Sequence, residues 1–154
     1  MGEDLFMRNA AQRPSIDAEG LLREYATTGN TAIRDRVVEA YLYIASIIAR
    51  RFSGRGVDYD DLYQVASLSL LKSIERFDPD RGVKFASFVT PTMVGEVKNY
   101  FRDRSRLIRL RFFEGKGQRE AAQEIGVSQM TVSRVERQAL AILREALTEG
   151  EKEA

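Results

Sequence analysis

The spacing that constrains this chain most lies between Ala122 and Val135. Ala122 is followed by glycine at +4 (Gly126) and by valine at +10 and +13 (Val132 and Val135). Two short helices cross closely only if a small residue lies at the crossing, a glycine takes the turn and two apolar residues seat the second helix. Ile125 and Val127 would complete this small core. The spacing therefore predicts a helix-turn-helix domain over 118–148.

The second helix of this predicted unit would present a polar and cationic face. Ser128 is a favourable N-cap for it. Such a helix typically enters the major groove, where Gln and Arg contact adenine and guanine edges. The alternative is a helix pair of purely structural use. The predicted DNA-reading residues are Gln129, Met130, Thr131, Ser133, Arg134 and Arg137.

Apolar residues upstream recur every three or four positions, which predicts helices over about 15–25, 31–52 and 58–77. A turn at Asp78–Gly82 precedes a fourth helix, which would begin near Phe85 or Ser87 and end near Arg104. The predicted fold class is all-α, an N-terminal helical bundle followed by a small helix-turn-helix domain. The remaining segments would be a mobile tail (1–16), a linker (105–117) and an acidic tail (149–154), with the helical domain over 17–104.

Aromatic and cationic residues alternate within 77–104, where Phe85, Phe88, Tyr100 and Phe101 lie among Lys84, Lys98, Arg102 and Arg104. Rings that stack on bases and cations that meet phosphates suit single-stranded nucleic acid. A core helix with buried aromatics is the alternative.

Positive charge is concentrated although the net charge is only +1. Between Lys98 and Arg119, eight Lys or Arg residues stand against two acidic ones. A basic belt in a neutral chain is typical of phosphate contact, and a solvated helix surface would look the same.

Composition excludes several classes of function. The chain has no cysteine and no histidine, so disulfides, the usual zinc sites and Ser-His or Cys-His catalysis are excluded. We expect no metal, no cofactor and no enzymatic activity. No apolar run approaches the roughly 20 residues that span a bilayer, and the N-terminus lacks the order of a signal peptide. We therefore expect a cytoplasmic protein without a membrane partner.

Two stretches together resemble the sigma-70 family of bacterial RNA polymerase sigma factors, nearest its sporulation and general-stress branch. The second conserved region of that family resembles DYDDLYQVASLSLLKSIERFDPDRGVKFASFVTPTMVGEVKNYFRD, and the helix-turn-helix of its fourth region resembles KGQREAAQEIGVSQMTVSRVERQALAILRE. The string DDLxQxAxLxLLKSIERFDPxRG is far more specific than a lone helix-turn-helix. The resemblance implies an alternative sigma factor that binds core polymerase and directs promoter-specific initiation.

The resemblance also assigns surfaces, residue by residue. The helix that docks on the clamp helices of the largest polymerase subunit would use Asp60, Asp61, Leu62, Gln64 and Leu68. The segment that handles the melted strand of the −10 element would use Phe85, Phe88, Thr90, Pro91 and Thr92, and the face that reads its upstream end would use Glu96, Lys98, Asn99 and Arg102. The six residues predicted to read DNA after Ser128 would read the −35 element. An anti-sigma protein is a further partner that the resemblance implies.

The chain departs from the family in two places. Housekeeping members have two tryptophans where this chain has Pro91 and Thr92. The third region is missing at Arg104–Ser105, either through a deletion or because the sequence leaves residues out. We favour the second explanation, because the break falls inside an expected domain. An intact mass well above 17.5 kDa would support it, and a mass equal to that value would contradict it.

Two other classes of function compete with the sigma factor. A stand-alone helix-turn-helix regulator would have no use for the helix at 60–77 or for the aromatic segment after it. A decoy that occupies polymerase or an anti-sigma protein without starting transcription fits the short connection after Arg104.

Overall fold

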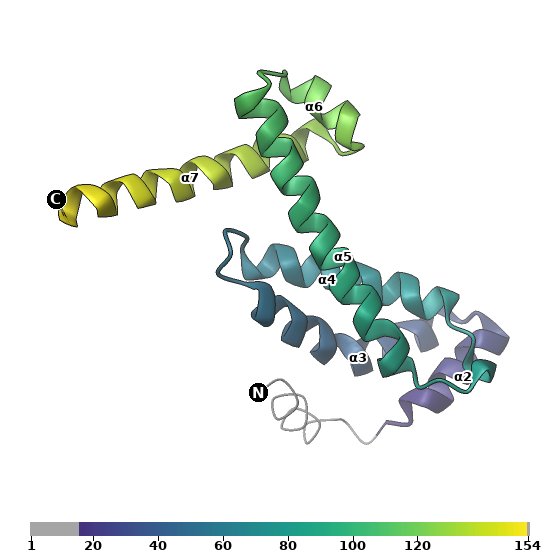
Figure 1. Cartoon of the computed structure of the whole chain (residues 1–154). Coiled ribbons are helices and arrows are strands. Elements are labelled where there is room, and N and C mark those ends of the chain that lie inside the picture. Colours follow the sequence, from purple (N-terminus) through teal and green to yellow (C-terminus); the bar gives the residue numbers. More distant parts are fainter. Residues whose placement is uncertain (1–15, 154) are drawn as a thin grey trace. The chain divides into compact units, whose positions relative to one another are not determined.

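The computed structural model describes residues 16–153, and most of these are helical. The elements are α2 (Ala18–Thr28), α3 (Thr31–Phe52), α4 (Tyr59–Arg76), the 3-10 turn η1 (Pro79–Arg81), α5 (Phe85–Ile108), the π-helical turn η2 (Arg109–Phe113), α6 (Gln118–Ile125) and α7 (Gln129–Glu153) (Figure 1). No strand occurs in this described part, so the all-α prediction is confirmed. The mobile tail predicted over 1–16 lies almost wholly outside it.

The chain divides into two compact units, and the boundary lies within α5. The first unit comprises the residues up to Ser53 and Asp58–Val97, and the second comprises 54–57 and everything from Lys98 onward. The boundary predicted from the sequence lies seven residues later, at Arg104. The difference arises because the buried stripe that α5 contributes to the first unit ends at Val97.

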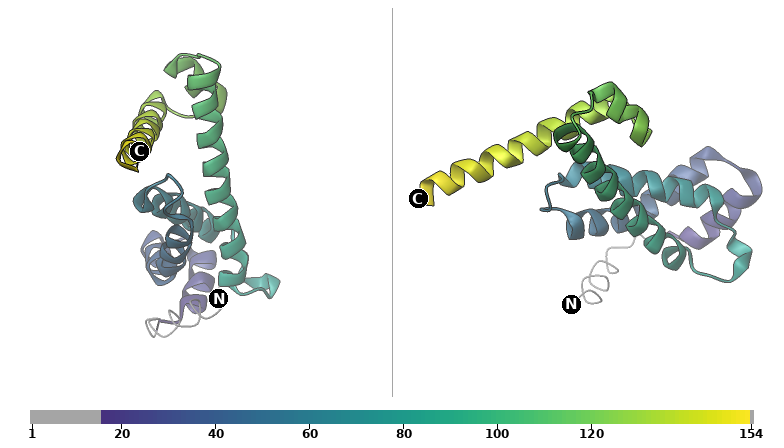
Figure 2. Two further views of the ribbon diagram at one scale, coloured as in Figure 1. Left: turned by 60° about the vertical axis from the view of Figure 1, so that its left-hand side comes forward. Right: turned by 45° about the horizontal axis from the view of Figure 1, so that its top comes forward.

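Helices α2 and α3 each begin directly after a residue whose side chain caps the helix. Asp17 caps α2 by accepting a hydrogen bond from the Gly20 N–H (2.9 Å), and Asn30 caps α3 through the Ala32 N–H (2.9 Å). The N-cap of α3 is therefore Asn30, one residue before the first helical residue, Thr31. Helix α3 packs against both α2 and α4, as the views in Figures 1 and 2 show.

The first half of α5 completes the core of the first unit. Phe85, Val89, Met93 and Val97 follow one another at four-residue intervals, and each is fully buried. Pro91 lies inside the helix but on its exposed side. Because the buried stripe continues past Pro91 on the other side, the proline does not end the helix.

The second unit contains the predicted helix-turn-helix. Ala122, Val132 and Val135 are buried together, and Ile125 and Val127 pack against them. Gly126 has a left-handed backbone (φ 81°) at the end of α6, and Ser128 accepts a hydrogen bond from the Thr131 N–H (3.1 Å) at the start of α7. The helix-turn-helix predicted from the spacing is confirmed.

The segment 105–117 differs from the linker expected there. Helix α5 runs without a break through Arg104 and Ser105 to Ile108, and η2 follows it directly. Leu107 is buried in the helix-turn-helix core and Leu110 is also buried. The three-residue spacing of Leu107 and Leu110 is the sequence feature that indicates a helix here. Only the four residues at 114–117 form a loop.

Among residues 16–153, no helix is both long enough and apolar enough to cross a membrane.

Candidate nucleic-acid interface

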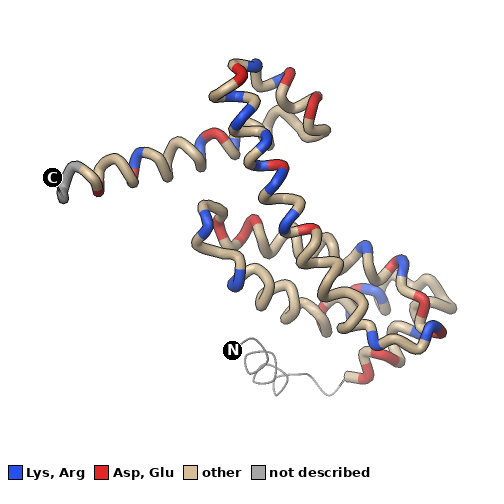
Figure 3. The backbone as a smooth tube through the Cα atoms, viewed as in Figure 1, with Lys and Arg blue, Asp and Glu red and all other residues tan. Residues whose placement is uncertain are grey.

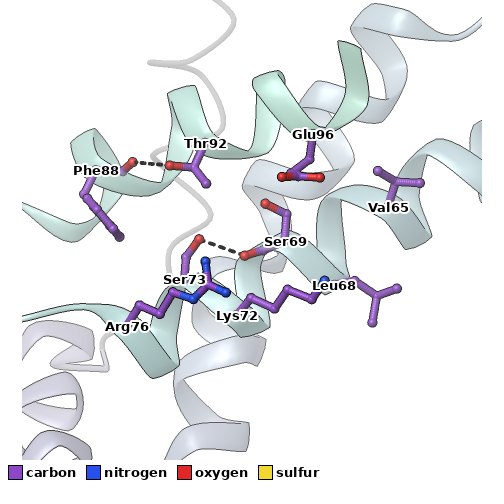
Figure 4. A pocket seen from close by; sticks show the side chains of 9 residues that line it. All are labelled: Val65, Leu68, Ser69, Lys72, Ser73, Arg76, Phe88, Thr92 and Glu96. Carbon is purple, nitrogen blue, oxygen red and sulfur yellow. Dashed lines mark hydrogen bonds between the residues drawn. The ribbon is translucent and has the colours of Figure 1, made fainter. Parts of the chain in front are cut away.

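A groove of about 410 Å³ lies between α4 and the first half of α5 in the first unit (Figure 4). It is partly open to solvent. Its lining mixes aromatic, aliphatic, hydroxyl and charged side chains. The lining residues are Val65, Leu68, Ser69, Lys72, Ser73 and Arg76 of α4 with Phe88, Thr92 and Glu96 of α5.

Phe88 is the aromatic surface of this groove. Its ring lies 5.3 Å from that of Phe77 and 6.3 Å from that of Phe85, while 37% of the residue remains exposed. The two neighbouring rings restrict its motion, which lowers the entropy lost when a base stacks on it. Phe88 is therefore a partly exposed ring held by two other rings, and bases stack on exposed aromatic rings of this kind in proteins that bind single strands.

Cations and hydroxyls line the α4 side of the groove. Lys72 and Arg76 are exposed one helical turn apart. Ser73 donates a hydrogen bond to the Ser69 carbonyl (2.8 Å), whereas the buried Ser69 hydroxyl has no hydrogen-bond partner among the described residues. Lys72 and Arg76 thus line the same groove as the Phe88 ring. The sequence-based prediction does not include Lys72 and Arg76, although Leu68, Lys72 and Arg76 follow one another at four-residue intervals.

The predicted polymerase-binding residues divide between surface and core. Asp60, Gln64 and Leu68 lie at four-residue intervals on α4 and are exposed. Leu62 is fully buried and Asp61 is only 9% exposed. The structure corrects the prediction for these two residues, because as buried side chains they support the α4 surface rather than form it.

The residues predicted to handle the −10 element share helix α5. The structure exposes Phe88, Pro91, Thr92, Glu96, Lys98, Asn99 and Arg102, whereas Thr90 is half-buried. Thr90 donates to the Ala86 carbonyl (2.7 Å) and Thr92 to the Phe88 carbonyl (3.2 Å).

Phe85 is the exception, because it has no exposed surface. Its ring packs 4.8 Å from Tyr41 and 5.0 Å from Phe77, both edge-to-face. A buried ring cannot stack on a base, so the structure corrects the sequence prediction. Phe85 is the buried member of the aromatic cluster, and Phe88 is its partly exposed member.

The start of α7 presents the predicted recognition face. Met130 is 80% exposed, Gln129, Arg134 and Arg137 are exposed, and Thr131 and Ser133 are half-buried. Val132 and Val135 point the opposite way, into the core of the second unit. One helix thus combines a seated apolar face with an open polar face, as base reading in a groove requires.

A polar network that was not predicted from the sequence holds α7 to the elements before it. Arg111 of η2 forms an ion pair with Glu136 of α7 and also donates to the Lys116 carbonyl. Gln118 at the start of α6 donates to the same Glu136 carboxylate. Since Glu136 is only 9% exposed, these partners satisfy a nearly buried charge and fix the orientation of α7.

A second ion pair in this unit predicts its response to acid. The hydrogen bond from Lys116 lowers the pKa of Glu124 below its usual 4.5. A lowered pKa stabilises the fold above pH 4.5, and this contribution is lost as the pH falls through the shifted pKa. We expect the Glu124→Gln variant to lose less stability than the wild type on acidification below about pH 4.5, at low salt.

Thermal unfolding followed by circular dichroism across this pH range measures the difference. Glu145→Gln, an exposed change on α7, is the matched control and should retain the wild-type acid response. Equal acid sensitivity of Glu124→Gln and the wild type would contradict the assignment.

Basic residues concentrate on the second half of α5 and on η2 (Figure 3). Exposed cations there include Lys98, Arg102, Arg106 and Arg109. Arg106 contacts Glu124 (3.4 Å) and Arg109 contacts Glu114 (3.4 Å), both near the surface. Such exposed pairs are weak, so these cations remain accessible to phosphates.

Two models of one protein family match the chain in the order of its two units. The model described as Sigma-70 region 2 matches residues 37–107, and the model described as Sigma-70, region 4 matches residues 103–145. The chain belongs to the sigma-70 family. The first match contains the α4–α5 groove, and the second contains α6, most of α7 and η2. The linker predicted over 105–117 therefore falls within the region 4 match.

Individual relatives of this sigma-70 chain are named as sigma-F and sigma-G factors. It is 42% identical over 82 residues to the RNA polymerase sigma-F factor of Kitasatospora aureofaciens, which covers 53% of this chain and 28% of the relative. It is 50% identical over 72 residues to the RNA polymerase sigma factor SigF of Mycobacterium tuberculosis. This alignment covers 47% of this chain and 28% of the relative. A putative RNA polymerase sigma-G factor of Bacillus thuringiensis is 37% identical to this chain over 83 residues. This alignment covers 54% of this chain and 66% of the relative. The match thus spans little more than a quarter of the first two relatives.

Proposed function

We propose that this chain is an alternative sigma factor, which binds core RNA polymerase and directs initiation at specific promoters. The observation that carries the proposal is the order of the two family matches, region 2 and then region 4, on units whose exposed surfaces suit DNA. The mechanism involves no covalent chemistry and no enzymatic activity. The chain would supply sequence specificity to a polymerase, in the cytoplasm, and an anti-sigma protein would restrain it.

The DNA contacts follow from the α4–α5 groove and from the exposed face of α7. Melted −10 bases would stack on Phe88, while Lys72 and Arg76 would contact the phosphates of the same strand. The upstream end of this element would be read by Glu96, Lys98, Asn99 and Arg102, which lie on the exposed face of α5. The start of α7 would read the −35 element through Gln129, Met130, Thr131, Ser133, Arg134 and Arg137. The groove suits single strands and the α7 face suits duplex, which matches the division of labour in promoter opening.

Polymerase binding tests the proposal through α4. We expect the double variant Asp60→Ala, Gln64→Ala to bind core RNA polymerase more weakly by on the order of tenfold or more, because both side chains lie on the proposed docking surface. Both are exposed, so folding should be retained. Asp61 is unsuitable for this test because it is buried.

The measurement is the affinity of fluorescently labelled chain for core polymerase. Glu39→Ala, an exposed acidic change on α3 outside the proposed surface, is the control and should bind as the wild type does. A folded wild-type chain that fails to bind polymerase would reject the sigma-factor proposal and favour a stand-alone regulator.

The overlap of the two family matches supports a second candidate function. Because the region 2 match ends at 107 and the region 4 match begins at 103, no residues remain between them for a third region. The connection is helical through Phe113 and rises only about 1.5 Å per α-helical residue, against about 3.5 Å for an extended chain. A chain with so short a connection could occupy polymerase without opening promoters. Polymerase binding without transcription in a reconstituted assay would favour this decoy function.

A further inference from the structure

Glu19 links three helices of the first unit through one carboxylate oxygen. Its Oε1 accepts a hydrogen bond from the Tyr41 hydroxyl (3.3 Å) and another from the backbone N–H of Phe85 (3.3 Å). Glu19 belongs to α2, Tyr41 belongs to α3, and Phe85 is the first residue of α5. One exposed side chain therefore bonds to the first residue of α5.

The bond to Phe85 has the chemistry of a helix cap. The first N–H groups of a helix have no partner within that helix, and a carboxylate is favoured there by the helix dipole. The Phe85 N–H is such a group, and its acceptor lies 66 residues earlier in the chain. Helix α5 thus receives part of its N-terminal cap from α2 rather than from its own flanking residues.

The first turn of α5 carries the groove's aromatic surface. Phe88 lies three residues after the capped position, and its ring packs on Phe77 and Phe85. The Tyr41 ring also packs on Phe85, 4.8 Å away, so both groups that bond to Glu19 belong to or adjoin this cluster. If the first turn of α5 frays, Phe88 loses its fixed position beside Lys72 and Arg76.

Helix α2 also contacts the turn that leads into α5. Arg23 lies 3.8 Å from Asp80 of η1, and α2 packs against η1. None of the residues that line the groove belongs to α2, and α2 precedes the region 2 match at 37–107. Its contacts nevertheless meet both the turn and the first residue of the DNA-facing helix.

We propose that Glu19 is a positioning residue, whose carboxylate holds the first turn of α5 so that Phe88 is ready to stack on an unpaired base. This inference rests on the proposed function of the α4–α5 groove. It assigns α2 a role in strand binding that requires no contact with DNA.

The test uses the full chain and the variants Glu19→Ala, Glu19→Gln and Glu24→Ala. Glutamine retains an acceptor oxygen, and Glu24 is an exposed acidic residue on the same helix that serves as the control. Amide hydrogen exchange at Phe85 and fluorescence anisotropy with labelled mixed-sequence single-stranded DNA provide two readouts. Thermal unfolding of each variant separates a positioning effect from a global loss of stability.

We expect Glu19→Ala to speed exchange at Phe85 and to weaken single-strand binding, each by roughly fivefold, as for a lost helix cap. Glu19→Gln should show a smaller change and Glu24→Ala none. The proposal is overturned if Glu19→Ala matches Glu24→Ala in both readouts, or if its effects follow global unfolding. A wild-type chain that does not bind the strand contradicts the proposed function and the DNA role of Glu19, while exchange at Phe85 still decides whether Glu19 caps α5.

Discussion

Replacing Phe85 with alanine is expected to destabilise the first unit by about 3–5 kcal/mol, because it empties the centre of the aromatic cluster. Phe85 is fully buried and touches Tyr41, Phe77 and Phe88 with its ring. The cavity cannot be filled without moving three aromatic side chains. Denaturant unfolding followed by circular dichroism, with hydrogen exchange in α3 and α4, measures the loss.

Phe88→Ala is the matched control, since it removes the neighbouring ring of the same cluster. Phe88 is 37% exposed, so its removal should cost clearly less stability than that of Phe85. It should instead weaken binding of single-stranded DNA by the equivalent of about 1–3 kcal/mol, the usual contribution of one stacked base. If Phe85→Ala proved harmless to stability and selectively weakened DNA binding, the roles of the two rings would have to be exchanged.

Replacing Val132 with aspartate should unfold the helix-turn-helix. Val132 is fully buried against Leu107, Ala122 and Val135, and no cation is part of that cluster. An unpaired buried charge costs several kcal/mol, a loss that the small core of this unit does not offset. We expect the amide signals of α6 and the first turns of α7 to collapse to unfolded positions in an NMR spectrum, and duplex DNA binding to be lost.

Met130→Asp is the control that introduces the same aspartate at an exposed position of the same helix. Met130 precedes Val132 by two residues on the same helix but is 80% exposed. Its substitution should change stability by no more than about 0.5 kcal/mol. Because Met130 is a predicted DNA contact, this control applies to folding alone. A folded Val132→Asp variant, or an unfolded Met130→Asp variant, would show that the core has been misplaced.

Local spacing determined much of this protein. Ala122, Gly126, Val132 and Val135 predicted the helix-turn-helix because a close crossing of two helices admits few residue types at those positions. The periodicity of apolar residues predicted the helices of the first unit, since one face of each must be buried. The string from Asp60 to Gly82 indicated the sigma-70 family, which both family matches bear out.

Tertiary structure alone decided which side of each helix is accessible. Leu62 and Phe85 carry residue types that suit binding, yet both are buried. Lys72 and Arg76 line the groove, although no sequence motif distinguishes them from other surface cations. Sequence periodicity indicates the direction of a side chain relative to its own helix. It does not show which neighbouring helix covers that direction.

Long-range polar partners were equally invisible in the sequence. The bond from the Phe85 N–H to Glu19 joins residues 66 positions apart, and Arg111 pairs with a glutamate 25 positions away. A charged residue in a sequence has many possible partners, and only the packing of helices brings one of them within bonding distance. The sequence by itself therefore determined the helices, their order and the family, while the fold decided which residues meet and which remain open to DNA.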